Sequence, residues 1–287
     1  MKIAVLSGKG GTGKTLVSVN LAAVAKKSIY LDCDVEEPNG HFFFKPENIK
    51  EENISIKIPI VNQALCHGCR KCVDFCKFNA LAYIKDKVVV FEEVCHSCGG
   101  CRIVCPQNAI SEKDKVIGRI QKGKSHHVDV NTGILNIGIA AGIPIIDKLL
   151  ANNRKSGADV MTFIDCPPGS ACSVMESIKD ADYCVLVAEP TIFGVHNLEM
   201  VYELVKLFNK PFGIVINKCL EGENLVDQFC SEKGVKILER IPYDYELGTL
   251  NSNGMIVARE NEKYKRLFSN LLETVMGEVQ GERTSNS

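Results

Sequence analysis

Apolar and polar positions at the start of the chain indicate a strand, a loop and a helix. Residues 2–7 (KIAVLS) form a short apolar run that ends in a glycine-rich segment, and residues 14–27 carry apolar side chains at helical spacing. A second apolar run over residues 28–33 (SIYLDC) follows at once. This segment therefore predicts a βαβ unit whose two strands are parallel and buried.

Later apolar runs continue the alternation through the second half of the chain. Strands are predicted over residues 160–165, 183–189, 212–217 and 235–241, with helical stretches between them such as residues 197–208 and 225–233. Strands that alternate with helices are typical of an open, mostly parallel sheet with helices on both faces. We therefore predict an α/β fold for most of the chain.

A cysteine-rich segment interrupts this alternation and repeats itself. Residues 66–81 (CHGCRKCVDFCKFNAL) match residues 95–110 (CHSCGGCRIVCPQNAI) at a period of 29, with every cysteine in register. Two copies suggest a small domain with two-fold pseudo-symmetry. We predict a small α+β domain over 59–112, inserted into an α/β domain formed by 1–58 and 113–287. The lysine-rich stretch 111–125 is interpreted as the return linker, a solvated loop in preference to a docking patch.

Composition and charge narrow the class of protein. The chain has 287 residues, 45% of them hydrophobic and 24% charged, and its 34 basic and 35 acidic residues give a net charge of −1. A balanced charge argues against nucleic-acid binding by bulk charge. No apolar run approaches the ~20 residues that span a bilayer, and the first residues do not resemble a signal peptide. We expect a cytoplasmic protein with no nucleic-acid partner and no stable membrane insertion.

The loop between the first strand and the first helix has the pattern G-x-x-x-x-G-K-[ST] of a phosphate-binding loop. Glycines in such a loop let backbone N–H groups surround phosphates, and the helix N-terminus adds positive charge. Lys14 would contact the β- and γ-phosphates, and Thr15 would hold Mg²⁺ through its hydroxyl. The alternative is a glycine-rich turn without a ligand. The predicted loop comprises Gly8, Lys9, Gly10, Gly11, Thr12, Gly13, Lys14 and Thr15.

Carboxylates end the neighbouring predicted strands. Asp165 closes the run at 160–165, one residue before a Pro-Pro-Gly turn, which is the place of a Mg²⁺-binding Walker B aspartate. Asp32 and Asp34 end the second strand, where a parallel sheet would turn their carboxylates toward Mg²⁺ or an attacking water. We expect one of these two to be catalytic, with a helix cap or a turn contact as the alternative role.

Cysteine spacing in the repeat indicates iron–sulfur clusters. Eight cysteines in one stretch of a large chain favour metal over disulfides. Both runs have the spacing C-x2-C-x2-C-x3-C, as in bacterial ferredoxins with two cubane clusters, where the fourth cysteine of each run ligates the other cluster. We predict one [4Fe–4S] cluster on Cys66, Cys69, Cys72 and Cys105, and a second on Cys95, Cys98, Cys101 and Cys76.

Zinc is the rival interpretation, because paired C-x2-C motifs also form four-thiolate zinc sites. Zinc does not require a crossed fourth cysteine, so the spacing favours cubanes. Lys77 stands where proline usually follows the fourth cysteine, which weakens the turn but leaves ligation intact. His67 and His96 lie inside the cysteine loops; we interpret them as surface residues, with tuning of a cluster potential as the alternative.

With its additional Lys9, the loop GKGGTGKT resembles the deviant Walker A motif of the MinD/ParA/Mrp superfamily, which includes the nitrogenase iron protein. Residues 31–39 (LDCDVEEPN) resemble switch I, and residues 164–170 (IDCPPGS) resemble Walker B with switch II. Residues 188–191 (AEPT) resemble the strand-end segment that follows. Two further segments, 216–218 (INK) and 241–244 (IPYD), resemble the adenine-binding loops.

The resemblance implies a P-loop ATPase that binds ATP and Mg²⁺. It implies that Asp34 positions the attacking water, that Asn217 contacts adenine, and that Pro242 with Tyr243 packs near the base. Lys9 would reach across a homodimer, formed in the ATP state, to the nucleotide of the partner; a solvated loop lysine is the alternative. The expected catalytic residues are Lys9, Lys14, Asp34 and Asp165.

Six cysteines lie outside the repeat, and one of them, Cys172, is a candidate ligand for a cluster between two subunits. Cys172 lies seven residues after Asp165, where the nitrogenase iron protein carries a ligand of its intersubunit cluster. No second cysteine occurs between Ile110 and Asp165, and no C-x2-C follows Ala188, so we do not expect a bridging cluster. Most of the remaining cysteines are expected to be small buried hydrophobes beside strands; these cysteines are Cys33, Cys166, Cys184, Cys219 and Cys230.

Three functions follow as hypotheses. The preferred one is an ATP-driven redox protein, in which a nucleotide-gated dimer passes electrons through two [4Fe–4S] clusters to a protein partner. The second is an assembly factor that carries an iron–sulfur cluster or metal cofactor to an acceptor, against which the missing bridging cysteines count. The third is a positioning ATPase of the MinD/ParA type. Mixed charge over residues 259–276 argues against a membrane-binding helix there and favours packing on the sheet.

Overall fold

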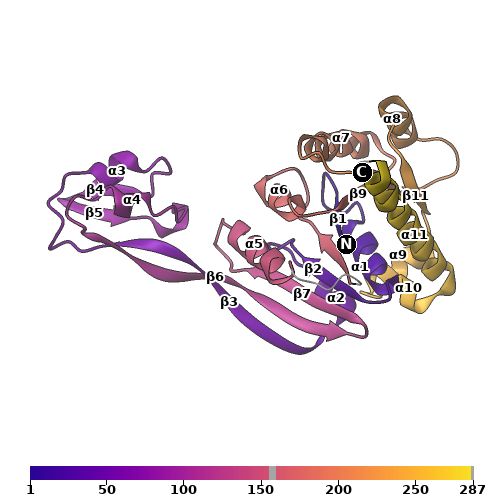
Figure 1. Ribbon diagram of the computed structural model, residues 1–287, viewed down its shortest axis with the longest axis horizontal. Helices are drawn as coiled ribbons and strands as arrows, with labels where there is room; N and C mark the ends of the chain where they lie inside the picture. Colours follow the sequence, from indigo (N-terminus) through magenta and orange to yellow (C-terminus); the bar gives the residue numbers. More distant parts are fainter. Residues whose placement is uncertain (155–159, 286–287) are drawn as a thin grey trace. The chain divides into compact units, whose positions relative to one another are not determined.

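A computed structural model describes residues 1–154 and 160–285, and Figure 1 shows their course. The chain divides into two compact units. We call Met1–Glu51, Ile120–Ile134 and Ile146–Ser287 the large unit, and Glu52–Arg119 with Leu135–Ile145 the cysteine unit. The cysteine unit extends beyond the predicted insert at 59–112, because the strands β3 (Glu47–Val61) and β6 (Ile110–Ser125) cross the division.

The described residues form a nine-stranded sheet with the order β11-β10-β9-β1-β8-β2-β7-β6-β3. β1 pairs in parallel with β8 and β9, β2 with β8 and β7, and β10 with β9 and β11, which confirms the predicted α/β sheet. The bounds of these strands are β1 (Lys2–Leu6), β2 (Ser28–Asp32), β7 (Val128–Leu135), β8 (Met161–Asp165), β9 (Tyr183–Ala188), β10 (Phe212–Cys219) and β11 (Ile237–Pro242).

Helices cover both faces of this sheet. On one face lie α1 (Lys14–Val24), α10 (Val257–Glu260) and α11 (Glu262–Ser285), which share a core with the sheet. On the other face, α6 (Cys172–Ile178) contacts β1, α7 (Ile192–Leu207) contacts β9, and α8 (Leu225–Lys233) contacts α7. Among the described residues, three further helices lie outside the cysteine-rich repeats, namely α2 (Gly40–Phe44), α5 (Ile143–Asn152) and α9 (Tyr245–Ser252).

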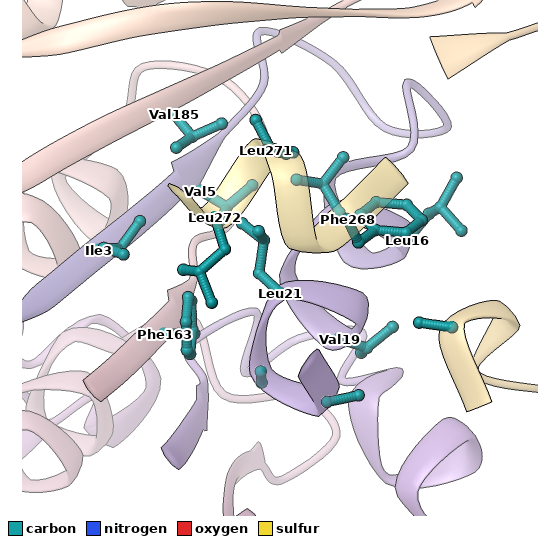
Figure 2. Close-up of a cluster of buried hydrophobic side chains, with 14 of the residues drawn as sticks. Ile3, Val5, Leu16, Val19, Leu21, Phe163, Val185, Phe268, Leu271 and Leu272 are labelled. Carbon is teal, nitrogen blue, oxygen red and sulfur yellow. The ribbon is translucent and has the colours of Figure 1, made fainter. Parts of the chain in front are cut away.

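The core under α1 and α11 explains why the C-terminal helix packs on the sheet. Apolar side chains of α11 recur at helical spacing and face strand residues such as Ile3, Phe163 and Val185 (Figure 2). Each removes apolar surface from water, and a fully buried side chain of this size contributes about 2–3 kcal/mol. The buried stripe of α11 comprises Tyr264, Phe268, Leu271, Leu272, Val275 and Val279.

The interpretation of residues 111–125 as a linker loop was wrong. They form most of strand β6, which lies between β7 and β3 in the sheet. Ile117 and Ile120 are fully buried, while Lys113 and Lys124 of the same strand are exposed. A strand needs only one buried side, so the abundant polar residues concealed it.

The cysteine unit repeats its backbone as well as its sequence. The hairpin of β4 (Leu81–Ile84) and β5 (Lys87–Val90) is accompanied by η1 (Glu92–Val94) and by two short helices in contact with each other, α3 (Lys71–Phe75) and α4 (Gly100–Ile103). Left-handed backbone conformations recur at the repeat period of 29 residues. The repeat-related pairs are Gly68 with Ser97, Arg70 with Gly99, and Asn79 with Asn108.

Candidate functional site

The predicted phosphate loop connects β1 to α1, as expected. Gly11 and Gly13 have φ values of +79° and +98°, a backbone region that side chains other than glycine rarely adopt. A Cβ at Gly8 would lie 1.9 Å from the carbonyl oxygen of Asn197 on α7, and one at Gly13 would lie 2.1 Å from the Asn217 amide. The glycines are therefore required by the left-handed turns and by the close approach of neighbouring elements.

Lys14 lies buried among carboxylates at the carboxyl ends of β2 and β8. Its Nζ is 2.7 Å from Oδ1 of Asp165 and 3.6 Å from Oδ2 of Asp34. Burial opposes the charge of Lys14, but Asp165 and Asp34 outweigh it and hold its pKa above the usual value. Lys14 is therefore a fixed cation beside the loop, and its present partners are side chains that a phosphate could replace.

The two aspartates of the second strand have different surroundings. Asp34 lines a cavity, and burial raises its pKa to about 6 although Lys14 is nearby. Asp32 is fully buried, its pKa is raised by burial and by Asp165, and its Oδ2 accepts the N–H of Gly40 at 2.8 Å. Asp32 thus has the structural role that was given as an alternative, since it binds the N–H of the first residue of α2. Of the two aspartates, only Asp34 lines the cavity.

Tyr30, which sequence reasoning missed, completes this cluster. Its hydroxyl donates to Oδ2 of Asp165 at 2.8 Å. Its fully buried ring packs beneath α2, where a Cβ at Gly40 would come within 2.2 Å of it and the Phe44 ring lies 4.9 Å away between centroids. A tyrosine inside an apolar strand looks like an ordinary core residue, and only the pairing of β2 with β8 places its hydroxyl at the aspartate.

A cavity of about 680 Å³ opens beside the phosphate loop. The predicted residues that line it are Lys9, Gly10, Gly11, Gly13, Lys14, Thr15 and Asp34, with Pro168 of the switch II segment. Sequence reasoning did not single out another part of the lining, which comes from α2 and from the end of α9: Phe42, Phe43, Asn251, Ser252, Asn253 and Gly254. These residues thus converge on one space large enough to take a ligand, whereas Gly8, Thr12 and Asp165, also predicted for the site, are not part of its lining.

The residues expected at adenine do not line this cavity. Asn217 is buried and donates its Nδ2 to the carbonyl of Thr12 at 2.7 Å, which supports the phosphate loop from behind. Tyr243 is 67% exposed at the end of β11, beside the exposed Pro242. Contacts of these three residues with a base stay a prediction.

Lys9 is held by a neighbouring acid. Its Nζ lies 3.0 Å from Oε2 of Glu189, a residue just past the end of β9. Lys218 also pairs with Glu189, and its Nζ lies 3.2 Å from the carbonyl oxygen of Gly11. Burial opposes the charge of Glu189, yet the two lysines hold its pKa below the usual value. Glu189 belongs to the AEPT segment at residues 188–191. No sequence pattern predicted that its carboxylate would pair with Lys9 of the phosphate loop.

Two small cavities in the cysteine unit each adjoin four cysteines. Cavity A is lined by one group of four, Cys66, Cys69, Cys72 and Cys105. Cavity B is lined by the other, Cys76, Cys95, Cys98 and Cys101. These groups coincide with the crossed sets expected from the spacing. Each draws three cysteines from one repeat and the fourth from the other.

The four cysteines of each cavity are the number and kind of donors that a [4Fe–4S] cluster needs. No cysteine among the described residues is in a disulfide, and no three His, Cys, Asp or Glu side chains there are gathered as for one metal ion. In a cubane each thiolate binds a different iron, so the sulfurs surround a space instead of meeting at one ion. The Sγ atoms of Cys76 and Cys105 also accept backbone N–H groups from Ala80 and Ala109, both at 3.3 Å.

The cysteines of the large unit are mostly structural, as expected. Cys172 is exposed at the start of α6, whereas Cys219 is partly exposed. The remaining four are buried beside strands or helices, namely Cys33, Cys166, Cys184 and Cys230. Within the described residues, no helix has both the length and the apolar character needed to cross a membrane.

Comparison with known proteins relates this chain to nucleotide-binding domains. A family model described as the CobQ/CobB/MinD/ParA nucleotide binding domain matches residues 3–257. An uncharacterized protein of Methanocaldococcus jannaschii is 34% identical over 277 residues, which cover 95% of each chain. Another protein of that organism, named iron-sulfur cluster carrier protein, is 28% identical over 303 residues, 96% of this chain and 85% of the relative.

Comparison with solved structures also finds a nucleotide-binding protein of similar fold. The cell division ATPase MinD of Pyrococcus furiosus aligns over 96% of this chain and 98% of its own, with a TM-score of 0.60 and 16% identity. At that identity the likeness shows a common fold, a mostly parallel α/β sheet with helices on both faces.

Tyr30→Phe tests whether the tyrosine hydroxyl holds Asp165. Removing it leaves Oδ2 of Asp165 without its donor, so we expect unfolding free energy to fall by about 1–2 kcal/mol. We also expect weaker Mg²⁺-dependent nucleotide binding, measured by titrating Mg²⁺ with a fluorescent ATP analogue. Tyr202→Phe is the matched control, since Tyr202 is also buried but contacts the rings of Phe212 and Phe229. If Tyr30→Phe and Tyr202→Phe required the same Mg²⁺ concentration for nucleotide binding, the result would contradict the proposal that the Tyr30 hydroxyl positions Asp165.

Asp34→Asn tests the raised pKa of Asp34. The pKa of Asp34 is about 6 in the folded protein, against 3.8 for an ordinary aspartate, so folding favours the protonated carboxyl. The stability that Asp34 contributes is therefore present below about pH 4 and is lost as the pH rises through 6. The ligand-free variant, which does not ionise, should therefore be more stable than the wild type at pH 8, by about 1–2 kcal/mol after solvent screening. Thermal unfolding across pH 4–8 measures this, and a difference that does not shrink toward pH 4 would count against it.

Proposed function

Since this chain belongs to the CobQ/CobB/MinD/ParA nucleotide-binding family, we propose that it is an ATP-hydrolysing iron–sulfur protein that passes electrons through two [4Fe–4S] clusters. ATP binding would assemble a homodimer, and hydrolysis would release it. The observation that carries the redox half of this proposal is the pair of cavities in the cysteine unit. Each adjoins four cysteines, in the crossed combination that two-cluster ferredoxins use.

ATP hydrolysis would use the carboxylates that now surround Lys14. On binding, the phosphates would occupy the cavity beside the loop, and Lys14 would exchange Asp165 and Asp34 for the β- and γ-phosphate oxygens. Asp165 and the Thr15 hydroxyl would then be free to hold Mg²⁺, which neutralises charge that develops on the phosphates. Asp34, released from Lys14 and open to the cavity, would orient the attacking water.

The cysteine unit would hold the clusters through its eight thiolates. A bound [4Fe–4S] cluster supplies one-electron transfer at low potential. The residues around it set how readily it accepts an electron, through N–H bonds to sulfur, nearby charges and exclusion of water. Ala80 and Ala109 supply one such N–H bond to each group of four cysteines.

Dimerisation would draw Lys9 away from Glu189. The Lys9 side chain is 37% exposed, and an ion pair of that kind contributes only about 0–1 kcal/mol. The γ-phosphate of a partner's ATP offers a stronger anion, so exchange of Glu189 for phosphate is favourable with ATP and not with ADP. This difference would give ATP the higher affinity for the dimer.

A second candidate function is delivery of an iron–sulfur cluster to an acceptor protein. It is favoured by the printed name of the M. jannaschii relative, iron-sulfur cluster carrier protein. The two functions differ in the fate of the iron, because a carrier loses iron to an apo-acceptor during ATP turnover and an electron carrier keeps it. Iron retained by this chain after many turnovers beside an apo-ferredoxin would therefore exclude delivery.

Anaerobically prepared protein should contain about eight irons per chain, two cubanes of four. Lys14→Ala should abolish ATP hydrolysis and leave the iron content unchanged, because the loop and the cysteines belong to different compact units. Lys206→Ala, which removes an exposed lysine from α7, is the control and should change neither quantity. Stoichiometric zinc in place of iron would exclude the redox function, and joint loss of iron and hydrolysis would show that the units depend on each other.

Mg²⁺-ATP should drive dimerisation of the hydrolysis-slow variant Asp34→Ala, and adding Lys9→Ala should remove the dimer while ATP stays bound. Sedimentation velocity with ATP, with ADP and without nucleotide measures the change. Lys218→Ala is the matched control, since it removes the other lysine on Glu189 and should leave the dimer intact. A sedimentation coefficient indifferent to ATP and to Lys9 would overturn the dimer proposal.

A further inference from the structure

We propose that the two cavities of the cysteine unit hold clusters of unequal potential, and that the first electron settles on the cluster in cavity A. This inference rests on the proposed function, because it presumes a [4Fe–4S] cluster in each cavity. The internal repeat makes it testable. Residues related by the period of 29 occupy equivalent places around the two cavities, so each cavity serves as the reference for the other.

Several features are the same around both cavities and therefore cannot make the two reduction potentials unequal. Each receives three cysteines from its own repeat and one from the other. The crossing cysteine, Cys105 in cavity A and Cys76 in cavity B, accepts one backbone N–H at 3.3 Å in both cases. One cysteine in each set is nearly buried, Cys72 at 7% and Cys101 at 8% exposure. Any difference in potential therefore comes from the side chains that have changed between the repeats.

The first change is an aromatic cover over cavity B. Phe78 and His96 both line this cavity and stack on each other, with ring centroids 3.7 Å apart and planes 14° apart. Their repeat mates, Gln107 and His67, line cavity A, where the phenyl ring is replaced by an amide. The phenyl ring of Phe78 has no hydrogen-bonding group to hold water at cavity B, whereas the amide of Gln107 offers both donors and an acceptor at cavity A. Water stabilises the additional negative charge of a reduced cluster, so the cover lowers the potential in cavity B.

The second change is a cation beside cavity A. Arg70 lines cavity A, and its guanidinium lies 4.5 Å from the centroid of the Tyr83 ring, which fixes its position. The mate of Arg70 in the other repeat is Gly99, which lines cavity B without any side chain. Positive charge near a cluster stabilises the added electron and raises the potential.

Other charged residues in the linings do not cancel this difference. Cavity B is lined by Lys57 and by Glu112, one charge of each sign. Lys57 pairs with Asp114 at 2.9 Å, and Glu112 pairs with Arg102 at 3.2 Å. The lining of cavity A contains Arg70 and no carboxylate. Charge and solvent exclusion therefore act in the same direction and place the higher potential in cavity A.

Unequal potentials give the electron path a direction. A one-electron reductant such as dithionite would add one electron to one cluster at each step, and an electron that entered at cavity B would pass to the higher potential in cavity A. The side of the cysteine unit that carries Arg70 and His67 is accordingly the side on which reducing equivalents rest.

The experiment is a potentiometric titration of the full-length, anaerobically prepared protein with dithionite as reductant, followed by electron paramagnetic resonance. We expect eight irons per chain and two separate one-electron steps. Phe78→Gln, which copies Gln107 into the other repeat, should shift the lower potential upward and leave the upper one unchanged. Arg70→Gly, which copies Gly99 and suits the left-handed backbone at φ +61°, should shift the upper potential downward alone. The double variant should bring the two steps together.

Two controls separate these effects from general changes in the unit. Lys71→Ala removes an equal charge from the position after Arg70 but lines neither cavity, and Phe91→Gln removes an exposed ring that also lines neither. Both should produce smaller shifts than the variants above. Eight irons with a single potential, or variants that move both steps equally, would overturn the inference alone. An iron content far below eight would overturn the proposed function and the inference with it.

Discussion

The buried contact between Lys14 and Asp165 is the constraint on which the large unit depends. Lys14 is 6% exposed and Asp165 is 1% exposed, and taking such charges out of water costs several kcal/mol each. The cost is offset only because the ammonium, the carboxylate and the Tyr30 hydroxyl meet at hydrogen-bond distance. The loop after β1 and the ends of β2 and β8 are therefore fixed together, and a ligand that takes over Lys14 must also release Asp165.

This cluster also connects the phosphate loop to α2. Tyr30 contacts Asp165 through its hydroxyl and Phe44 through its ring, and Asp32 holds the N–H of Gly40. Two residues of the same helix, Phe42 and Phe43, line the cavity beside the loop. A change in the partners of Asp165 therefore acts on a helix that borders the ligand site, through contacts that are all within one compact unit.

The cysteine unit depends on a different source of stability. Its apolar core is small and consists of Cys72, Ala80, Leu81, Val88, Cys101 and Ile110, with further cysteines packed against it. A core of that size supplies little stability, and small domains commonly gain the remainder from bound metal. Eight thiolates around two cavities would provide that stabilisation. Because the two halves of the unit repeat each other, small substitutions such as Phe78 against Gln107 stand out as differences between otherwise equivalent sites.

The sequence by itself determined the α/β class and six of the nine strands of the sheet, though not β3, β6 or β7, and it predicted the phosphate loop and the crossed groups of cysteines. These depend on local signals: apolar runs of strand length, glycines at fixed spacing before a lysine, and cysteine intervals that repeat. It misjudged residues 111–125, because a strand with mostly polar side chains is identified by its neighbours in the sheet and not by its own composition. Only the tertiary structure brought Tyr30 to Asp165, Glu189 to Lys9 and Asn217 to Thr12. Each of these contacts joins residues far apart in the chain, and their meeting depends on strand order and register, which no local pattern encodes.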